Sequence, residues 1–532
     1  MQLDHICAWK AIYDADLWDR VTVICEPCTK EMRKEIWNDI IAWADLADSP
    51  PVFWLTGQAG SGKTTITYTI AQYFDRLEKT GWHTVLAGTF FYSCQFEETR
   101  WQIHIIPTLV YQLTRKSRSY ALALNELGKF DSVDKLMKQM KDLFSDPWQQ
   151  SELQCHTELP PYLIIIDALD EIEADGGSMF LQVVLETINC FPLWGLKFLV
   201  TSRPDPCVVE LCGSFSSNAV CCLQDVLTDH VGSDIIKYLH VKLPTFVDMS
   251  ELNTMMQLAD GLFISTMTIV RYLTPHQGIT VKEQCKLLSK LCVWQSFSAS
   301  DTQQPLLINE LYQQILCEAF SGFDNDLFNS RLCILHTFLC TFECTSTSLA
   351  AALLSKSDEI VVAVLNQLHA ILYCKDDQVL WYHAPFPNFI FSQTETQSTF
   401  ELDGRQISMS IDKAHHHALL TKCCFNIMKL LHFNIGDIPL SFVLDDEDPE
   451  LMKWIDTNIE AVLRYILIYW LLYCSINGHP TTDFTSNLSD PSIHTVSYLN
   501  RCCQFWHCVD TMTSDASMQQ AEQGQEITGM YV

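Results

Sequence analysis

A glycine-rich turn between an apolar run and a helix-like stretch constrains this chain more than any other feature. The segment from 52 to 74 reads VFWLTGQAGSGKTTITYTIAQYF. Its first residues have the nearly continuous apolar character of a strand that is covered on both faces. We therefore expect a buried strand, a tight turn and a helix in immediate succession.

The turn fits the pattern G-x-x-x-x-G-K-[ST], the Walker A phosphate loop, in the context that its mechanism requires. Glycines let successive N–H groups point at one phosphate, and the following helix adds its positive end. The lysine reaches the terminal phosphates and the threonine hydroxyl holds Mg²⁺. We predict ATP or ADP, or GTP or GDP, with Mg²⁺. The predicted nucleotide-binding residues are Gly57, Gln58, Ala59, Gly60, Ser61, Gly62, Lys63, Thr64 and Thr65.

An acidic run, LIIIDALDEIE at 163–173, supplies the second half of such a site. Asp167 ends the expected strand at the sheet edge where α/β proteins bind ligands, so it and Thr64 are the predicted metal-binding residues. Glu171 is the first choice for a base that activates water, and Asp170 is the second. The competing interpretation is a strand end capped by solvated acids.

Arg203 follows another apolar run, in FLVTSRPDP at 198–206. From the same sheet edge its guanidinium can sense the γ-phosphate, either by stabilising charge or by reporting hydrolysis. We therefore place Arg203 in the catalytic group with Glu171 and Asp170. Many surface arginines do neither, so this assignment depends on the resemblance described below.

Three further short apolar runs lie at 84–92, 162–170 and 196–204, and helical patterns at 105–116 and 180–191 separate them. Strands that alternate with helices predict a doubly wound α/β domain with a parallel sheet. Beyond the last of these runs the pattern becomes mainly helical.

The balance of charge excludes several classes of partner. The 532 residues include 34 basic and 64 acidic side chains, a formal charge of −30. This field repels phosphate backbones and anionic lipids, so nucleic acid is not an expected partner. The N-terminal segment lacks the features of a secretory signal, and the most apolar segment, 462–476, is shorter than the roughly 20 residues that span a bilayer. We predict a cytoplasmic protein with no membrane span.

Three motifs, GQAGSGKTT, LIIIDALDE and LVTSRP, resemble in order and spacing the NACHT class of STAND nucleotide switches. Finer details are similar to the mushroom-type fungal NACHT proteins, namely FWLTGQAGSGKTT, PTLVYQL, DGLFISTMTIVRYL, NELYQQIL, QLHAIL and YHAPFPNFIF. The resemblance covers about residues 20–500. It implies a P-loop sheet followed by a helical domain, a winged helix and a second helical region.

The resemblance also implies roles for individual residues. Lys63 and Thr64 would hold phosphate and magnesium, Asp167 would bind the metal, and Arg203 would act as the sensor. In NACHT proteins a winged-helix histidine contacts the β-phosphate of bound ADP and latches the closed state. That histidine falls on His383.

The chain departs from the family's pattern at several positions. The upstream Thr-Arg pair near the base reads Thr29 and Lys30, and lysine lacks the planar fork of arginine. Cys94 stands where an arginine often follows the second strand, and Pro385 and Asn388 replace the usual serine and aspartate. The segment DGLFIS lacks the proline that packs on adenine. We expect intact phosphate chemistry, with base preference and hydrolysis rate open.

These signals divide the chain into six segments. They are an N-terminal flank with a short helix at 1–49, a nucleotide-binding NACHT domain at 50–222, a first helical domain at 223–305, a winged-helix domain at 306–395, a second helical domain at 396–510 and a disordered tail at 511–532. Since neither an effector nor a repeat sensor is visible, we expect a truncated or sensorless form.

The expected function is a nucleotide-dependent switch in signalling, with self/non-self recognition and programmed cell death as the context that the family implies. Exchange of ADP for ATP opens the chain for homo-oligomer formation, and slow hydrolysis resets it. Two alternatives stay open, a scaffold that binds nucleotide without turnover and a P-loop kinase or transferase. A kinase needs an acceptor lid before the acidic run, whereas 128–144 has the pattern of a plain amphipathic helix.

Overall fold

The computed structural model describes most of the chain up to residue 428 and a few positions beyond it. The described residues are 6–14, 26–29, 31–46, 48–77, 84–130, 135–154, 161–191, 193–213, 215–216, 219–223, 228–247, 249–275, 278–295, 305–391, 399–402, 405–408, 413–428, 457, 459–466 and 469. Lys30, most of the predicted second helical domain at 396–510 and the predicted tail at 511–532 lie outside them.

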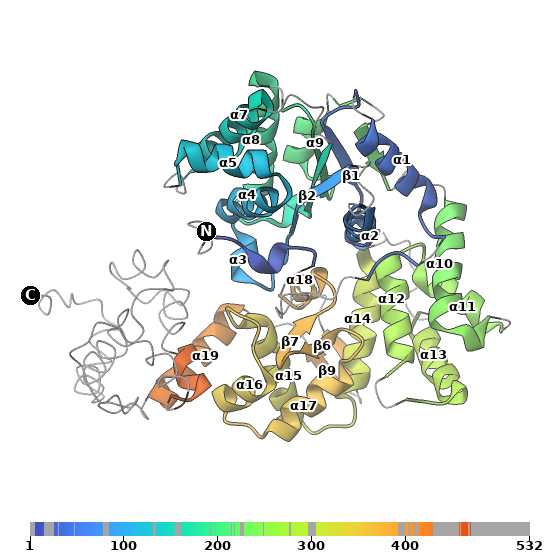
Figure 1. The fold of residues 1–532 in the computed structure, drawn as a ribbon. Helices are drawn as coiled ribbons and strands as arrows, with labels where there is room; N and C mark the ends of the chain where they lie inside the picture. The colour runs from blue at the N-terminus through green and yellow to red at the C-terminus, as the bar shows by residue number, and fades with distance from the viewer. Residues whose placement is uncertain are drawn as a thin grey trace, which may run out of the picture. The chain divides into compact units, whose positions relative to one another are not determined.

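A five-stranded parallel sheet with the order β2-β3-β4-β1-β5 lies at the centre of the N-terminal half (Figure 1). Its strands are β1 Val52–Thr56, β2 Val85–Phe91, β3 Tyr162–Asp167, β4 Leu196–Ser202 and β5 Val220–Cys222. Because the strands are parallel, the segments that follow β1, β3 and β4 meet at one edge of the sheet. The predicted α/β fold with a parallel P-loop sheet is confirmed.

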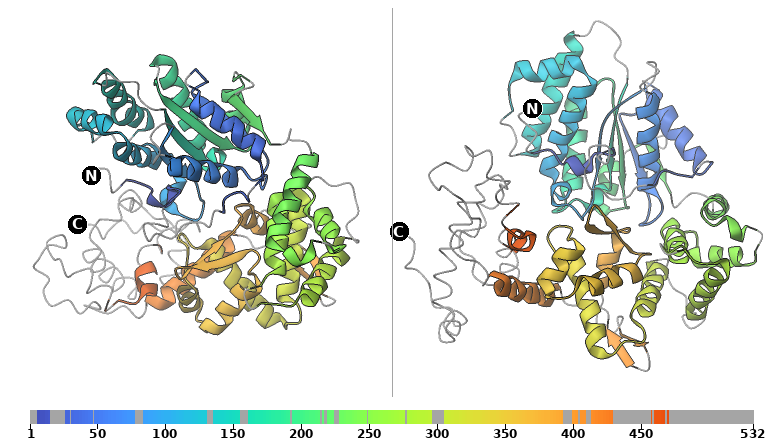
Figure 2. Two further views of the ribbon diagram at one scale, coloured as in Figure 1. Left: turned by 45° about the vertical axis from the view of Figure 1, so that its right-hand side comes forward. Right: turned by 60° about the horizontal axis from the view of Figure 1, so that its bottom comes forward.

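Alternate residues of the strands belong to two separate hydrophobic cores. In β1, Val52 and Trp54 contribute to one core, whereas Phe53 and Leu55 contribute to the other, and all four are buried. Successive side chains of a strand point to opposite faces, so a strand that is apolar throughout must be covered on both sides. Figure 2 shows the helices on the two faces of the sheet.

The two faces carry different sets of helices. Helices α1 and α2 cover the face of Phe53, and α4, α5, α7 and α8 cover the face of Trp54. The bounds are α1 Lys34–Asp45, α2 Lys63–Leu77, α3 Glu97–Arg100, α4 Ile105–Lys116, α5 Arg118–Leu127, α7 Asp146–Gln154, α8 Gly176–Cys190 and α9 Pro206–Cys212. The helical patterns at 105–116 and 180–191 correspond to α4 and α8, as predicted.

The segment 128–144 is not the single amphipathic helix that the sequence predicted. Gly128 has a φ of 61° and ends α5 in the left-handed region, where glycine carries no steric penalty. Helix α6 (Leu136–Gln139) then passes directly into a π-helical turn, η5 (Met140–Ser145). The wider turn places Phe144 in the core that covers the sheet.

The chain after the sheet divides between two compact units. The first unit comprises residues 1–323, 364–393 and 400–406, and the second comprises 324–363, 394–399 and 407–532. Within the described ranges, no helix combines the length and apolar character that crossing a membrane requires. The remaining helices of the first unit are α10 Thr228–Lys242, α11 Glu251–Ala259, α12 Phe263–Leu273, α13 Val281–Gln295, α14 Pro305–Phe320 and α18 Pro385–Phe391.

The other elements include two short strand pairs. The antiparallel hairpin β6 Leu372–Lys375 and β7 Gln378–Trp381 belongs to the first unit. The second unit holds α15 Asn325–Cys340, α16 Thr347–Leu354 and α19 Lys413–Met428. Helix α17 (Asp358–Gln367) continues from one unit into the other, and β8 Thr399–Leu402 pairs with β9 Arg405–Ser408.

Histidines form part of the packed core of the second unit. The Nε2 atom of His416 lies 3.0 Å from the Thr337 hydroxyl, and the ring of His417 stacks on Phe342. Burial lowers the pKa of His416 to about 3 and that of His417 to about 4, so both rings are neutral. No cluster of three metal-ligating side chains occurs in the described part of the chain.

Gly177, in the first turn of α8, lets that helix pack directly on the 3₁₀ turn Leu169–Glu171. A Cβ atom at Gly177 would lie 1.8 Å from the carbonyl oxygen of Leu169. We expect Gly177→Ala to lower the free energy of unfolding by about 1–3 kcal/mol, because the backbone must shift. The control is Gly232→Ala in α10, where the nearest atom would be 3.8 Å away; it should stabilise by about 0.5–1 kcal/mol.

Thermal unfolding of the two variants, followed by circular dichroism, measures this difference. A lower midpoint for Gly177→Ala and an equal or higher one for Gly232→Ala is expected. Equal midpoints would contradict the close packing of α8 on the 3₁₀ turn Leu169–Glu171, which we call the acidic turn.

Candidate functional site

The phosphate loop connects β1 to α2 at the carboxyl edge of the sheet. Gly60 and Gly62 have φ values of 76° and 97°, a region that glycine adopts without strain. Gly60 also lies against the start of α12, since its carbonyl oxygen accepts a hydrogen bond from the Ile264 N–H at 3.3 Å. A Cβ at Gly60 would lie 2.2 Å from Ile264, so both the backbone conformation and the close contact require glycine.

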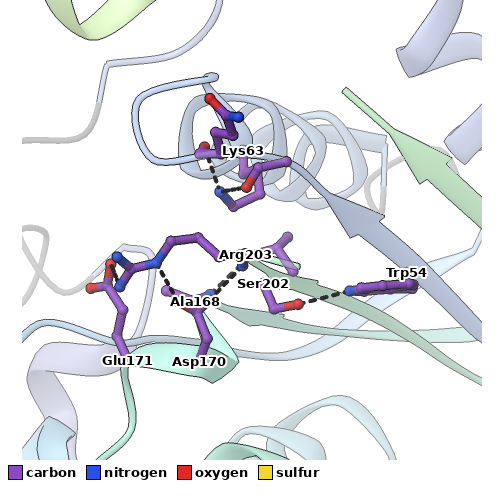
Figure 3. Close-up of polar contacts among 10 residues, drawn as sticks. Trp54, Lys63, Ala168, Asp170, Glu171, Ser202 and Arg203 are labelled. Atoms are coloured by element: carbon purple, nitrogen blue, oxygen red, sulfur yellow. Dashed lines mark hydrogen bonds and ion pairs between the residues drawn. The ribbon is translucent and has the colours of Figure 1, made fainter. Parts of the chain in front are cut away.

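The ammonium group of Lys63 is turned back onto the loop (Figure 3). Its Nζ atom donates to the carbonyl oxygens of Gly57 at 2.7 Å and of Gln58 at 3.0 Å. Burial lowers the pKa of Lys63, and the nearby carboxylates oppose that effect. Lys63 begins α2, so Thr64 and Thr65 occupy the first turn of that helix, where unpaired N–H groups favour anions.

The carboxylate of Asp167 is enclosed by three threonine hydroxyls, which we call the hydroxyl cage. Thr64 donates to Oδ2 at 2.6 Å, and Thr67 and Thr201 donate to Oδ1 at 3.0 and 2.7 Å. Asp167 is only 1% exposed. Burial raises its pKa, while the three hydrogen bonds act in the opposite direction. The cage therefore joins β3, α2 and β4 and brings together the two predicted metal-binding residues.

The acidic turn after β3 is held by Arg203 (Figure 3). Ala168 adopts a left-handed φ of 59°, and its N–H donates to Thr201 at 2.9 Å, which fixes where the turn begins. Asp170 accepts from the Arg203 backbone N–H at 2.7 Å and from its Nε at 2.5 Å. A second guanidinium nitrogen of Arg203 lies 3.1 Å from the Glu171 carboxylate. The three predicted catalytic residues are thus in direct contact.

The electrostatics of this turn make Glu171 suited to proton transfer. Burial raises its pKa to about 7, Arg203 and Lys63 lower it, and the charges of Asp170 and Asp167 raise it. A general base works best when its pKa lies near the working pH. This pKa is compatible with the role of base that the sequence predicted for Glu171, whereas Asp170 is committed to two bonds with Arg203.

Sequence reasoning missed Arg33, which lies beside the phosphate loop. Its Nη2 donates to the Ser61 carbonyl oxygen at 3.3 Å, its guanidinium carbon lies 4.9 Å from the centre of the Phe263 ring, and its backbone N–H donates to Asp234. Within the described residues, the buried Nη1 has no hydrogen-bond partner. A guanidinium beside the loop is therefore supplied by Arg33. Lys30, which the sequence placed near the base, lies outside the described residues.

His383 lies in a buried pocket of side chains from α12 and α14. Its Nδ1 is 3.3 Å from the Tyr312 hydroxyl and 3.5 Å from that of Thr268, and its Nε2 is 3.2 Å from Arg271 Nη1. A guanidinium only donates, so Nε2 accepts and the proton is assigned to Nδ1. Burial and then Arg271 lower the pKa of His383 well below its usual value. The ring is neutral, and Thr268 in turn donates to the carbonyl of Ile264 at the loop.

The missed residues carried weak local signals. Thr67 lies one helical turn after Lys63 and therefore on the same face of α2. Thr201 is a polar residue near the end of a fully buried strand, two positions before Arg203. Arg33 offered no pattern, because its left-handed φ of 54° and its contacts depend on residues far along the chain.

Comparison with protein families matches residues 36–203 to the family described as nephrocystin 3, N-terminal. The matched segment begins within α1 and ends at Arg203, so it includes the phosphate loop, the hydroxyl cage and the acidic turn. A comparison with curated proteins found no match.

Several solved structures match this chain at low sequence identity and low TM-scores. One is a STAND protein (signal transduction ATPase with numerous domains) with a tetratricopeptide repeat sensor from Pyrococcus horikoshii, at 13% identity and a TM-score of 0.34; the match covers 88% of this chain and 55% of that one. A Walker-type ATPase of Pyrococcus abyssi matches at 13% identity and a TM-score of 0.30. The match covers 68% of this chain and 98% of that one. The Orc1 protein of Aeropyrum pernix, solved in complex with DNA, matches at 12% identity and a TM-score of 0.32. The match covers 76% of this chain and 96% of that one. The chain thus spans about half the length of the first of these proteins.

We expect Thr201→Val to lower the free energy of unfolding by about 1–3 kcal/mol, because it leaves the buried Asp167 carboxylate and the Ala168 N–H each without one partner. The matched control is Thr187→Val in α8, where the hydroxyl bonds only within its own helix to the Val183 carbonyl. That change should cost about 0.5 kcal/mol or less. Thermal unfolding measures the stability of both variants. If Thr187→Val is as destabilised as Thr201→Val, the hydroxyl cage does not have the stabilising role described.

Proposed function

We propose that this chain is a nucleotide-dependent switch of the NACHT type, which binds ATP and ADP, or GTP and GDP, with Mg²⁺. The observation that carries the proposal is the hydrogen bond between Thr64 and Asp167 beside Lys63. A phosphate-binding lysine, a helix N-terminus and a hydroxyl-carboxylate pair then converge on one point. This combination supports a nucleoside triphosphate with its metal better than any other ligand class.

The donor set at this point fits magnesium. Mg²⁺ prefers hard oxygen ligands and is held by one or two protein groups together with phosphates and water. Thr64 and Asp167 provide a hydroxyl and a carboxylate oxygen 2.6 Å apart. When bound, Mg²⁺ would neutralise charge on the phosphates. The carbonyl oxygens of Gly57 and Gln58 hold Lys63 at the loop, from which its ammonium can turn to a phosphate.

Slow hydrolysis would reset the switch, with Glu171 as the base and Arg203 as the sensor. Arg203 now bonds both Asp170 and Glu171. For Glu171 to take a proton from water, its bond to the guanidinium must loosen, and a γ-phosphate is an anion that can attract Arg203 away. The need to break this pair before each turnover supports a low rate.

His383 is the proposed latch of the switch, in a winged-helix domain at about 306–395, through its hydrogen bonds to α12 and α14. A ligand shifts a conformation only if it binds the two states with different affinity, so ADP would favour the closed state and ATP the open state. We extend the proposal to self-association in the cytoplasm on activation. By its sequence resemblance, the context is signalling in fungal non-self recognition and programmed cell death.

Nucleotide binding is tested by Lys63→Ala. We expect its affinity for Mg²⁺ with ATP or GTP to fall about 10–100-fold, because a charge-assisted bond to phosphate is lost. Lys282→Ala, on an exposed position of α13, should bind like the wild type. Isothermal titration calorimetry with both nucleotides measures this. Equal affinities for the two variants, or no binding by the wild type, would refute the proposal.

Hydrolysis is tested by Glu171→Gln in single turnover. We expect the rate to fall about 100-fold or more, the usual contribution of a general base. Glu173→Gln, an exposed neighbour that pairs with Arg100, is the matched control and should keep its rate. In the wild type the rate should rise between about pH 6 and pH 8, because the base acts when ionised and the pKa of Glu171 is about 7.

Nucleotide affinity measured at each pH separates this effect from altered binding. A rate that falls with rising pH would contradict Glu171 as the base. If the wild type and Glu171→Gln both bind nucleotide and neither hydrolyses it, the scaffold without turnover replaces the switch.

A further inference from the structure

A glutamine side chain pairs with the main chain of the β6–β7 hairpin 286 residues away. Gln95 Nε2 donates to the Trp381 carbonyl oxygen at 3.0 Å, and the Trp381 N–H donates to Gln95 Oε1 at 2.9 Å. Both residues are buried. The primary amide thus satisfies both backbone groups of Trp381, as a neighbouring strand would.

Gln95 belongs to the loop that follows β2 and borders the acidic turn. This loop begins where the Tyr92 N–H approaches the Asp167 carbonyl oxygen at 3.5 Å. Arg100 holds its middle through the Cys94 carbonyl oxygen at 2.9 Å. At its far end the Arg100 carbonyl oxygen accepts from the Glu173 N–H at 3.0 Å. The loop that carries Gln95 is therefore bonded to the chain on both sides of the acidic turn, at Asp167 and at Glu173.

The two residues after Trp381 are held by α12. The guanidinium carbon of Arg271 lies 3.6 Å from the centre of the Tyr382 ring, and His383 contacts both Arg271 and Thr268. Helix α12 begins on the phosphate loop, where Ile264 donates to Gly60. Residues 381–383 are therefore connected to the phosphate loop through α12, and to the loop that borders the acidic turn through Gln95.

We propose that Gln95 is a positioning residue that couples the catalytic edge of the sheet to the β6–β7 hairpin. The inference rests on the proposed nucleotide switch. A change at the acidic turn moves the loop that carries Gln95, and the paired amide transmits that change to Trp381. Without this pairing, the hairpin opens independently of the nucleotide and the nucleotide leaves faster.

The test uses Gln95→Met in the full chain, which keeps the volume of the side chain and removes both hydrogen bonds. The chain offers a matched control in Gln112, which makes the same two-point contact with Thr89 of β2, at 2.8 Å to the carbonyl oxygen and 3.0 Å from the N–H. Gln112→Met therefore removes equivalent bonds inside the sheet domain and does not touch the hairpin.

Two measurements are made on each variant. The first is release of a fluorescent ADP analogue, which we expect to be about fivefold faster or more in Gln95→Met and unchanged in Gln112→Met. The second is amide hydrogen exchange of residues 378–382 with and without ADP. ADP should slow this exchange in the wild type and in the control, but no longer in Gln95→Met.

A third variant, Gln95→Glu, keeps the acceptor for the Trp381 N–H and, when ionised, cannot donate to the carbonyl. It should release ADP faster than the wild type, because an acceptor then faces the Trp381 carbonyl oxygen. Equal release from Gln95→Met and Gln112→Met would overturn the coupling. If the wild type binds no nucleotide, the proposed function fails instead, and exchange of 378–382 in the ligand-free chain decides whether Gln95 holds the hairpin.

Discussion

The hydroxyl cage around Asp167 is the contact on which the rest of the site depends. One carboxylate at the end of β3 is bonded to two threonines of α2 and to one of β4, so its position fixes the relative placement of three elements. The same Thr201 hydroxyl accepts from Ala168, which sets the direction of the acidic turn. Because the carboxylate is buried, leaving any of these bonds unmade is costly, and the site is organised before a ligand arrives.

The site also resolves a conflict between local and overall charge. The chain carries a formal charge of −30, a field that repels anions, yet three cations lie at the phosphate loop or beside the acidic turn. Lys63 is held by loop carbonyls, Arg203 by two carboxylates and Arg33 by a loop carbonyl and Asp234. Nearby carboxylates offset these cations, so the amide N–H groups of the loop and the N-terminus of α2 are the remaining groups that can attract an anion against the overall charge.

Local pattern was enough to predict the sheet and the loop, but not the contacts that connect distant segments. The strands β1 to β4 have continuous apolar runs, and the phosphate loop has a fixed spacing, so both are visible in short windows. The short strand β5 (Val220–Cys222) and the π-helical turn η5 follow no such pattern, because tertiary packing selects them. Arg33, Thr201 and Gln95 gain their roles from partners 28 to 286 residues away, which a window cannot contain.

The contact between Gln112 and Thr89 has a consequence for how this sheet meets other molecules. Strand β2 is at the outer side of the sheet, and an open border of this kind is a template for pairing with another chain. Gln112 occupies both main-chain groups of Thr89, and the Tyr13 N–H bonds its hydroxyl. The middle of β2 is therefore already hydrogen-bonded within its own chain. This disfavours edge-to-edge aggregation of strands in a protein that is proposed to assemble.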